Sequence, residues 1–151
     1  MQCKDKLHFL SCFGLGEYSI DQEFGTRTRS YPPHKGIDIA SPKAGQVFLA
    51  GIPGRIVPPL GGKWGIISLN PDKLSSTLVQ YIHCEEILCN IGDRVTAMTE
   101  IGTIGNRGHS KINLHIQVSI PGKPKFSDWK QFSRDRDFVD PINFFKGYYY
   151  E

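Results

Sequence analysis

The segment His34-Lys35-Gly36-Ile37-Asp38 and, much later, the segment Asn113-Leu114-His115 decide how this chain folds around a site. Side chains alternate faces along an extended strand, so His34 and Asp38 share one face, and Asn113 and His115 share another. Two such strands side by side bring two imidazoles and a carboxylate together. Three ligands of this kind hold zinc and leave the fourth tetrahedral position open, as in catalytic rather than structural zinc sites.

Length and charge limit the classes of protein to which the chain can belong. Its 151 residues fit one domain with a substantial core and are too few for two ordinary domains. The net charge of +3 is small, and no run of basic residues alternates with aromatic ones, so we expect no nucleic acid partner. A mild positive charge suits an anionic polymer such as a bacterial wall, but equally an ordinary solvated surface.

The apolar pattern predicts no membrane span. The longest apolar stretch is far too short to cross a bilayer, and the N-terminus lacks the basic, apolar and small-residue order of a signal peptide. We therefore expect no signal peptide in the chain as given, while a removed leader, or export by a route that uses none, stays open.

Short β-type runs, separated by sixteen glycines and ten prolines, dominate the chain, and no window shows a long apolar period of 3.6 residues. The expected strands are 46–50, 55–57, 65–69, 77–83 and 114–120, with turns at 51–54, 58–62 and 70–72. These spacings predict an all-β fold, mainly antiparallel, with a sandwich or barrel core.

Both ends are expected to extend this core. Residues 1–23 look irregular or marginally helical, 121–136 look like a polar loop, and 143–151 form an aromatic C-terminal tail. The tail is expected to dock on the sheet. The alternative is a patch that binds a protein partner.

Cysteine use leaves the compartment open. The even count of Cys3, Cys12, Cys84 and Cys89 allows two disulfides, and equally allows free buried thiols. No Cys-x-x-Cys spacing occurs, which disfavours a thiolate zinc knuckle or a thioredoxin-type redox site.

Several short motifs follow one another between Phe24 and Ile142. They are Phe24-Gly25-Thr26-Arg27, His34–Ala40, Tyr81-Ile82-His83, the glycine-bounded turns 91–95 and 101–105, and Asp140-Pro141-Ile142. In this order they resemble the lysostaphin-type, LytM-like zinc endopeptidases that cut bacterial peptidoglycan. The family's final His-x-His motif stands here as Asn113-Leu114-His115, so asparagine replaces its first histidine. The resemblance implies a peptidase-like domain over residues 24–142.

The resemblance also implies roles for individual residues. One Zn²⁺ per chain is assigned to His34, Asp38 and His115, and zinc polarises a scissile carbonyl while lowering the pKa of an attacking water. The two histidines that flank this water in the family correspond to His83 and Asn113. His83 is expected to donate a hydrogen bond to the developing oxyanion or to move a proton.

Asn113 and its neighbourhood raise two further expectations. Its amide can orient water but cannot act as a general base. His109, four residues upstream in a glycine-rich turn, is the candidate replacement, and an exposed loop histidine is the alternative. Tyr81, two residues from His83 along an expected strand, is predicted to share its face and contact substrate. Trp64 and Phe48 are expected in the core or at its rim, with the floor of a substrate groove as the alternative.

Three functions follow. The first is a zinc endopeptidase acting on cross-linking or stem peptides of peptidoglycan, slowed by Asn113. The second is a zinc-binding but catalytically silent relative that binds wall peptides or a protein partner. The third is a secreted antibacterial or accessory module. Each implies a location outside the cytoplasm, in the periplasm, in the cell wall or secreted.

Overall fold

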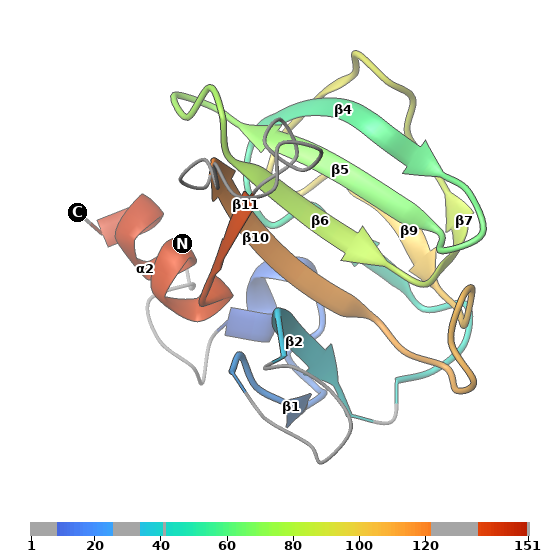
Figure 1. Ribbon diagram of the computed structural model, residues 1–151. Coiled ribbons are helices and arrows are strands. Elements are labelled where there is room, and N and C mark those ends of the chain that lie inside the picture. The colour runs from blue at the N-terminus through green and yellow to red at the C-terminus, as the bar shows by residue number, and fades with distance from the viewer. Residues whose placement is uncertain (1–8, 26–33, 41, 122–135, 151) are drawn as a thin grey trace, which may run out of the picture.

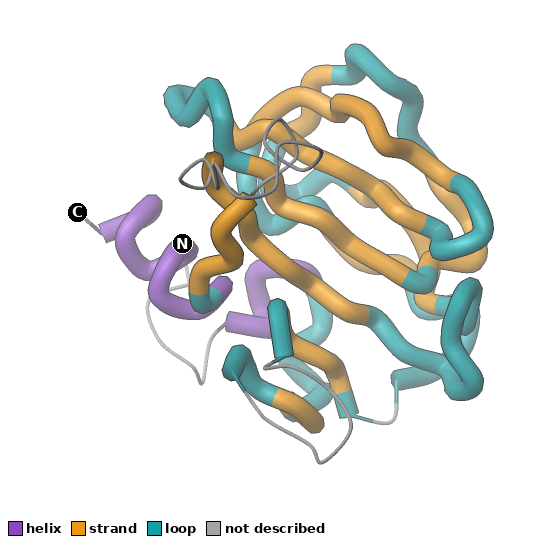
Figure 2. The backbone as a smooth tube through the Cα atoms, in the orientation of Figure 1, coloured by secondary structure: helices purple, strands orange, loops and turns teal. Residues whose placement is uncertain are grey.

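The computed structural model describes residues 9–25, 34–40, 42–121 and 136–150, and in these ranges two β-sheets form the framework of the fold (Figures 1 and 2). The elements are η1 (Leu10–Phe13), β1 (Ile20–Gln22), β2 (Gly36–Ile39), β3 (Val47–Leu49), β4 (Gly54–Gly61), β5 (Ile66–Pro71), β6 (Leu78–Ile82), β7 (Cys84–Ile87), β8 (Arg94–Val95), β9 (Glu100–Ile104), β10 (His115–Pro121), β11 (Arg136–Val139) and α2 (Pro141–Tyr150).

The larger sheet is built around β10. Its strand order is β1-β2-β10-β6-β5-β4-β8, and β11 also pairs with β10. β6 lies along one edge of β10, while β2 and then β11 pair in succession with the other edge. The smaller sheet has the order β3-β9-β7. Every pairing between described strands is antiparallel, which confirms the predicted all-β, mainly antiparallel fold.

The register of the larger sheet separates an apolar face from a polar one, because neighbouring rows of side chains point to opposite faces. One row that crosses the sheet is apolar and fully buried; it consists of Ile37, Ile116, Tyr81 and Ile67. The rows on either side of it face the other way; they consist of Gly36, Gln117, Gln80 and Ser68, and of Asp38, His115 and Ile82.

The apolar face forms the core with the smaller sheet and with both ends of the chain. Phe48 of β3 stacks on Tyr81, with ring centroids 5.6 Å apart. Phe13 of η1 lies 5.3 Å from Phe145 of α2, and neither ring is exposed. The expected docking of the aromatic C-terminus is therefore confirmed, although the segment is a helix rather than an irregular tail. The described part of the N-terminal extension likewise packs into the core.

Several predicted boundaries differ from the structure. The turn expected at 58–62 is wrong, since β4 continues through Pro58 and Pro59 to Gly61. The pairing of β4 with β5 is irregular between Val57 and Gly61, and a strand tolerates proline where the ladder is interrupted. The turn expected at 70–72 begins later, because β5 extends to Pro71. Most of the expected polar loop, 122–135, lies outside the described residues.

The cysteines resolve in part. Cys84 and Cys89 are free, buried thiols, and burial raises the pKa of Cys84 to about 12 and that of Cys89 to about 11. The alternative of free buried thiols, rather than a disulfide, therefore holds for Cys84 and Cys89. Cys3 lies outside the described residues. No helix in the described ranges has the length and apolar character needed to cross a membrane.

Candidate metal centre and active site

Three side chains from distant parts of the chain converge at the polar face of the larger sheet. His34 lies just before β2, Asp38 lies on β2, and His115 lies on β10 directly opposite Asp38. Nε2 of His34 is 3.1 Å from Oδ2 of Asp38, and Nδ1 of His115 is 2.8 Å from Oδ1. One carboxylate therefore lies between two imidazoles, whose ring centroids are 4.9 Å apart.

Gly36 is the residue that lets β2 approach β10 at this point. A Cβ atom at this position would stand 2.3 Å from the carbonyl oxygen of Ile116 and 2.8 Å from Nε2 of His115. No other residue leaves that space free. The glycine inside the His34–Asp38 motif thus allows the close approach of the two ligand-bearing strands.

This donor set fits a zinc ion. Ligand atoms of a tetrahedral zinc site with bonds of about 2.0–2.2 Å are roughly 3.3–3.6 Å apart. Here the candidate atoms of His34, Asp38 and His115 all lie within 4.8 Å of one another, so small rotations of the side chains would admit the ion. Two imidazoles and one carboxylate are ligands that zinc prefers, and they leave a fourth position for water or substrate.

The charges within the cluster shift its pKa values in opposite directions. Burial acts to lower the pKa of His34, but hydrogen bonding to Asp38 and the negative charge of Asp38 outweigh it, and the pKa is raised. Burial acts to raise the pKa of Asp38, but hydrogen bonds from His115 and His34 hold it well below its usual range. The carboxylate is therefore ionised and available to a cation at neutral pH.

His83 lies next to this cluster because the strand ends there. Its φ of 78° lies in the left-handed region, and its ring centroid is 6.5 Å from that of His115. Nδ1 of His83 lies 2.6 Å from the carbonyl oxygen of Arg107. A carbonyl only accepts hydrogen bonds, so Nδ1 carries the proton and Nε2 of the neutral ring keeps a free lone pair. Burial and the nearby His109 and His115 lower the pKa of His83, which favours this neutral form.

His109 approaches His83 through a glycine turn. The two ring centroids are 4.9 Å apart. Gly108 has a φ of 71°, and a Cβ atom there would stand 2.1 Å from the ring of Trp64, so only glycine lets the turn lie this close. Nδ1 of His109 lies 3.1 Å from the backbone nitrogen of Lys111 and 3.2 Å from the carbonyl oxygen of the same residue, so either neutral tautomer of the ring finds a partner there. His109 is exposed, as the alternative of a loop histidine predicted, and its ring lies beside that of His83, while its role as a replacement base stays a prediction.

Asn113 lies on the same side as the cluster. Its side chain is buried, at 7% exposure, and its backbone amide bonds to the carbonyl of Gly105. A groove of about 520 Å³ is lined by Asp38, His109 and Asn113 together with Asp21 of β1. The carboxylate, the loop histidine and the asparagine therefore line one polar groove.

The expected substrate contact of Tyr81 is wrong. Tyr81 is fully buried, and its hydroxyl donates to the carbonyl of Ala50 inside the core. It belongs to the apolar row of the sheet and thus faces away from Asp38 and His115. His83 would follow Tyr81 into the core by strand alternation, but its left-handed backbone turns it toward the cluster. Phe48 is a core residue, as expected, whereas Trp64 is 45% exposed beside the His109 turn.

Sequence reasoning missed the side chains behind His115. Nε2 of His115 lies 2.9 Å from Oε1 of Gln117, and Gln117 donates to Gln80 across the strand pair. The available signal was alternation, since Gln117 is two residues from His115 and shares its face. The contact of His83 with the Arg107 carbonyl carried no such signal, because it depends on a loop conformation.

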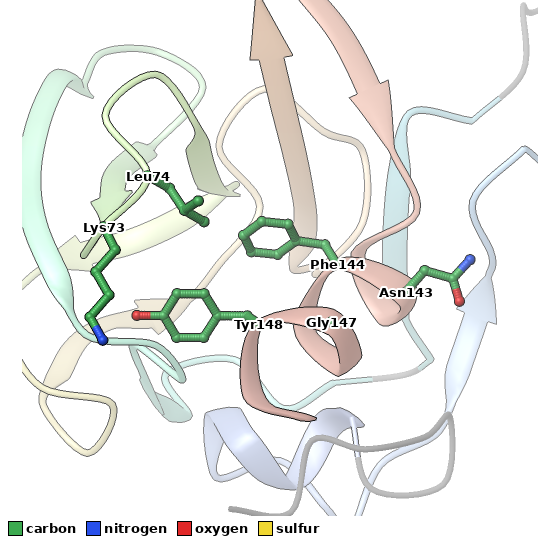
Figure 3. Close-up of a pocket in the computed structure, with 6 residues that line it drawn as sticks. All are labelled: Lys73, Leu74, Asn143, Phe144, Gly147 and Tyr148. Carbon is green, nitrogen blue, oxygen red and sulfur yellow. The ribbon is translucent and has the colours of Figure 1, made fainter. Parts of the chain in front are cut away.

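A second cavity lies far from the metal cluster in the fold. About 560 Å³ in volume, it is formed by the β5–β6 connection and α2 (Figure 3), and Lys73, Leu74, Phe144 and Tyr148 line it. In the close-up, the ring of Phe144 faces Leu74, and the hydroxyl end of Tyr148 points toward Lys73.

Comparison with known proteins agrees with this geometry. Residues 32–126, more than half of the chain, match the model of peptidase family M23, and the chain belongs to this family. An uncharacterised metalloprotease of Buchnera aphidicola is 30% identical over 92% of this chain and 38% of its own length. The murein hydrolase activator NlpD of Escherichia coli is 36% identical over 60% of this chain and 24% of its own length. The chain thus spans well under half of these relatives.

The fold is also that of a solved peptidase. Lysostaphin from Staphylococcus simulans, an antimicrobial peptidase, aligns with 92% of this chain and 54% of its own, with a TM-score of 0.70 and 23% identity. Members of family M23 are zinc metallopeptidases, and zinc is the cofactor that the cluster of two histidines and one aspartate fits.

Proposed function

We propose that the chain is a zinc endopeptidase that hydrolyses cross-linking or stem peptides of bacterial peptidoglycan. The observation that carries the proposal is the convergence of His34, Asp38 and His115 within 4.8 Å, with the free Nε2 of His83 beside them. Membership of family M23 supports the peptidase chemistry, and the murein-related name of one relative supports the substrate. Peptidoglycan lies outside the cytoplasmic membrane, so this function also places the chain there.

The residues divide the chemistry among them. Bound at His34, Asp38 and His115, zinc supplies the Lewis acidity that polarises a scissile carbonyl and lowers the pKa of an attacking water. His83 accepts the proton of that water at Nε2, because its Nδ1 proton is held by the Arg107 carbonyl. The same proton is then delivered to the departing amine.

The other two side chains of the site provide hydrogen bonds. In the tautomer that accepts a hydrogen bond from the Lys111 amide, His109 carries its proton on Nε2, and this N–H is assigned to the developing oxyanion as a donor. Asn113 lines the groove and orients substrate or water through its amide. In this division of roles, His109 replaces the family's missing histidine as a donor rather than as a base.

The test is release of new amino termini from purified peptidoglycan by the zinc-loaded protein. We expect release by the wild type and none above background by His115→Ala, which lacks one ligand. His109→Ala should lose about ten- to a hundredfold in rate with its zinc content unchanged, since one oxyanion donor is typically worth at least this much. His109→Gln, which keeps an N–H donor, should retain more activity than His109→Ala. Unchanged hydrolysis by His109→Ala would remove His109 from the mechanism.

A second candidate is favoured by Asn113 and by the name of the NlpD relative, a murein hydrolase activator. In it the chain binds zinc and wall peptides or a protein partner but does not cleave. The cavity beside α2 then accepts an apolar side chain of the partner between Phe144 and Tyr148. Stoichiometric zinc without new amino termini, together with partner binding that Phe144→Ala weakens, would replace the first candidate by this one.

A further inference from the structure

A row of polar side chains runs away from the metal cluster across three strands of the larger sheet. Nε2 of His115 contacts Oε1 of Gln117 at 2.9 Å. The amide nitrogen of Gln117 donates to Oε1 of Gln80 at 2.9 Å, and the amide nitrogen of Gln80 donates to Oγ of Ser68 at 3.0 Å. Gln117, Gln80 and Ser68 are partners in register on β10, β6 and β5, so the regular sheet itself sets their spacing.

The direction of this chain fixes the orientation of the Gln117 amide. Because its nitrogen is engaged by Gln80, its oxygen faces His115. An amide oxygen only accepts hydrogen bonds, so the ring nitrogen opposite it, Nε2, must carry a proton. The nitrogen of His115 that remains for a metal is then Nδ1, which already lies 2.8 Å from Oδ1 of Asp38.

The surroundings leave Gln117 little freedom to adopt another arrangement. Ser68 is fully buried at the far end of the row, and Gln117 and Gln80 are partly buried. On the other edge of β10, Gly36 is the register partner of Gln117, and its missing side chain leaves room for the His115 ring.

We propose that Gln117, held by Gln80 and Ser68, is a positioning residue that fixes the tautomer and ring orientation in which His115 binds zinc through Nδ1. The proposal rests on His115 being a zinc ligand, as in the proposed function. It adds that zinc affinity depends on side chains that never touch the metal. Loss of such outer partners typically costs ten- to a hundredfold in affinity.

The test measures zinc affinity of the metal-stripped protein by competition with a chromophoric chelator, without reference to activity. Gln117→Leu should weaken binding by about ten- to a hundredfold, and Gln117→Glu, which keeps an acceptor, should stay near wild type. Gln80→Leu should lie between them. Gln46→Leu is the matched control, since Gln46 is a partly buried glutamine bonded to the backbone of Val47, outside this row, and should leave affinity unchanged.

A second measurement keeps the proposal testable if Gln117→Leu does not fold. Nitrogen-15 spectra of the zinc-bound wild type should show His115 protonated at Nε2 and coordinated at Nδ1. Coordination through Nε2, or an affinity of Gln117→Leu within about twofold of wild type, would overturn the positioning role. Absence of zinc binding by the wild type, or wild-type affinity of His115→Ala, would instead overturn the ligand assignment on which the proposal rests.

Discussion

At the scale of single residues, the site shows how one backbone dihedral changes the role of a side chain. His83 continues the alternation that buries Tyr81, and only its φ of 78° directs the ring toward the cluster. The contact with the Arg107 carbonyl then selects the tautomer with a free Nε2. Sequence motifs could assign His83 to the site through a family resemblance, but strand alternation alone would have buried it.

Asn113 gives the sharpest prediction at this scale. Asn113→His adds an imidazole to the groove beside Asp38 and His109, at a position where the asparagine amide cannot act as a general base. We expect the rate of peptide release to rise by up to about a hundredfold, because general-base assistance is typically worth this much or more. Initial rates on purified peptidoglycan at saturating zinc measure the change.

Zinc content is the control for Asn113→His, since a histidine at this position is also a potential ligand. The metal should remain at one ion per chain. A flat rate with zinc still bound would show that position 113 does not limit hydrolysis, and that His83 alone manages the proton.

At the scale of elements, the sheet register accounts for what could be predicted from the sequence and what could not. Alternation predicted a shared face for His34 and Asp38, and another shared face for Asn113 and His115. Of these four residues, only Asp38 and His115 lie within the regular strands Gly36–Ile39 and His115–Pro121. Strand pairing could not be predicted in this way, because no local sequence pattern identifies β2 and β6 as the neighbours of β10. The row from Gln117 to Ser68 therefore escaped prediction.

The helix α2 and the strand β4 show two other limits. The run Phe144-Phe145 with Tyr148-Tyr149 reads as an aromatic cluster, yet its spacing also suits a helix that buries Phe145 against Phe9 and Phe13. The helix is stabilised by packing against Phe9 and Phe13. These residues lie near the other end of the chain, so the local sequence of the tail does not indicate them. Likewise, Pro58 and Pro59 predict a turn locally, but β4 continues past them and its pairing with β5 resumes at Gly61.

Gly36→Ala is the prediction for the strand pair that carries the site. The added Cβ would meet the Ile116 carbonyl at 2.3 Å, which forces β2 away from β10 and moves Asp38 relative to His115. We expect zinc affinity to fall by about tenfold or more, together with a lower midpoint of thermal unfolding, because a backbone contact cannot be relieved by rotating a side chain. Calorimetry and chelator competition measure the two effects.

Gly45→Ala is the comparison for this variant. Gly45 has a φ of 81°, but no atom lies within 4 Å of the added methyl group. It should pay only the strain of a left-handed backbone, about 1–2 kcal/mol, and keep wild-type zinc affinity. Equal affinities for Gly36→Ala and the wild type would show that the spacing of β2 and β10 does not control the metal site.

At the scale of the whole molecule, the two faces of the larger sheet have separate tasks. The apolar face is covered by the smaller sheet, η1 and α2, so both ends of the described chain stabilise the scaffold (Figure 1). The polar face carries the cluster, His83 and the supporting glutamines. The same strands therefore contribute to folding stability and to zinc binding. Both quantities should depend on pH, because protons on the cluster residues affect each of them.

This coupling predicts how zinc stabilises the protein as pH changes. The pKa of His34 is raised above 6.5 in the zinc-free protein, so its contribution to folding stability is complete below the unfolded value and is lost as pH rises through the folded value. The lowered pKa of Asp38 contributes stability above its unfolded value and is lost only in strong acid. Zinc must displace the proton from His34, so its affinity should increase with pH across the range in which that proton leaves.

We therefore expect the rise in unfolding temperature caused by saturating zinc to be larger at about pH 8 than at about pH 6. Scanning calorimetry with and without zinc measures it, and calorimetric titration in buffers of different ionisation enthalpy should detect protons released on binding near pH 6. His34→Ala should bind zinc more weakly and release fewer protons. A zinc effect of equal size at both pH values would show that no proton of the cluster competes with the metal. It would contradict the assignment of His34 as a zinc ligand.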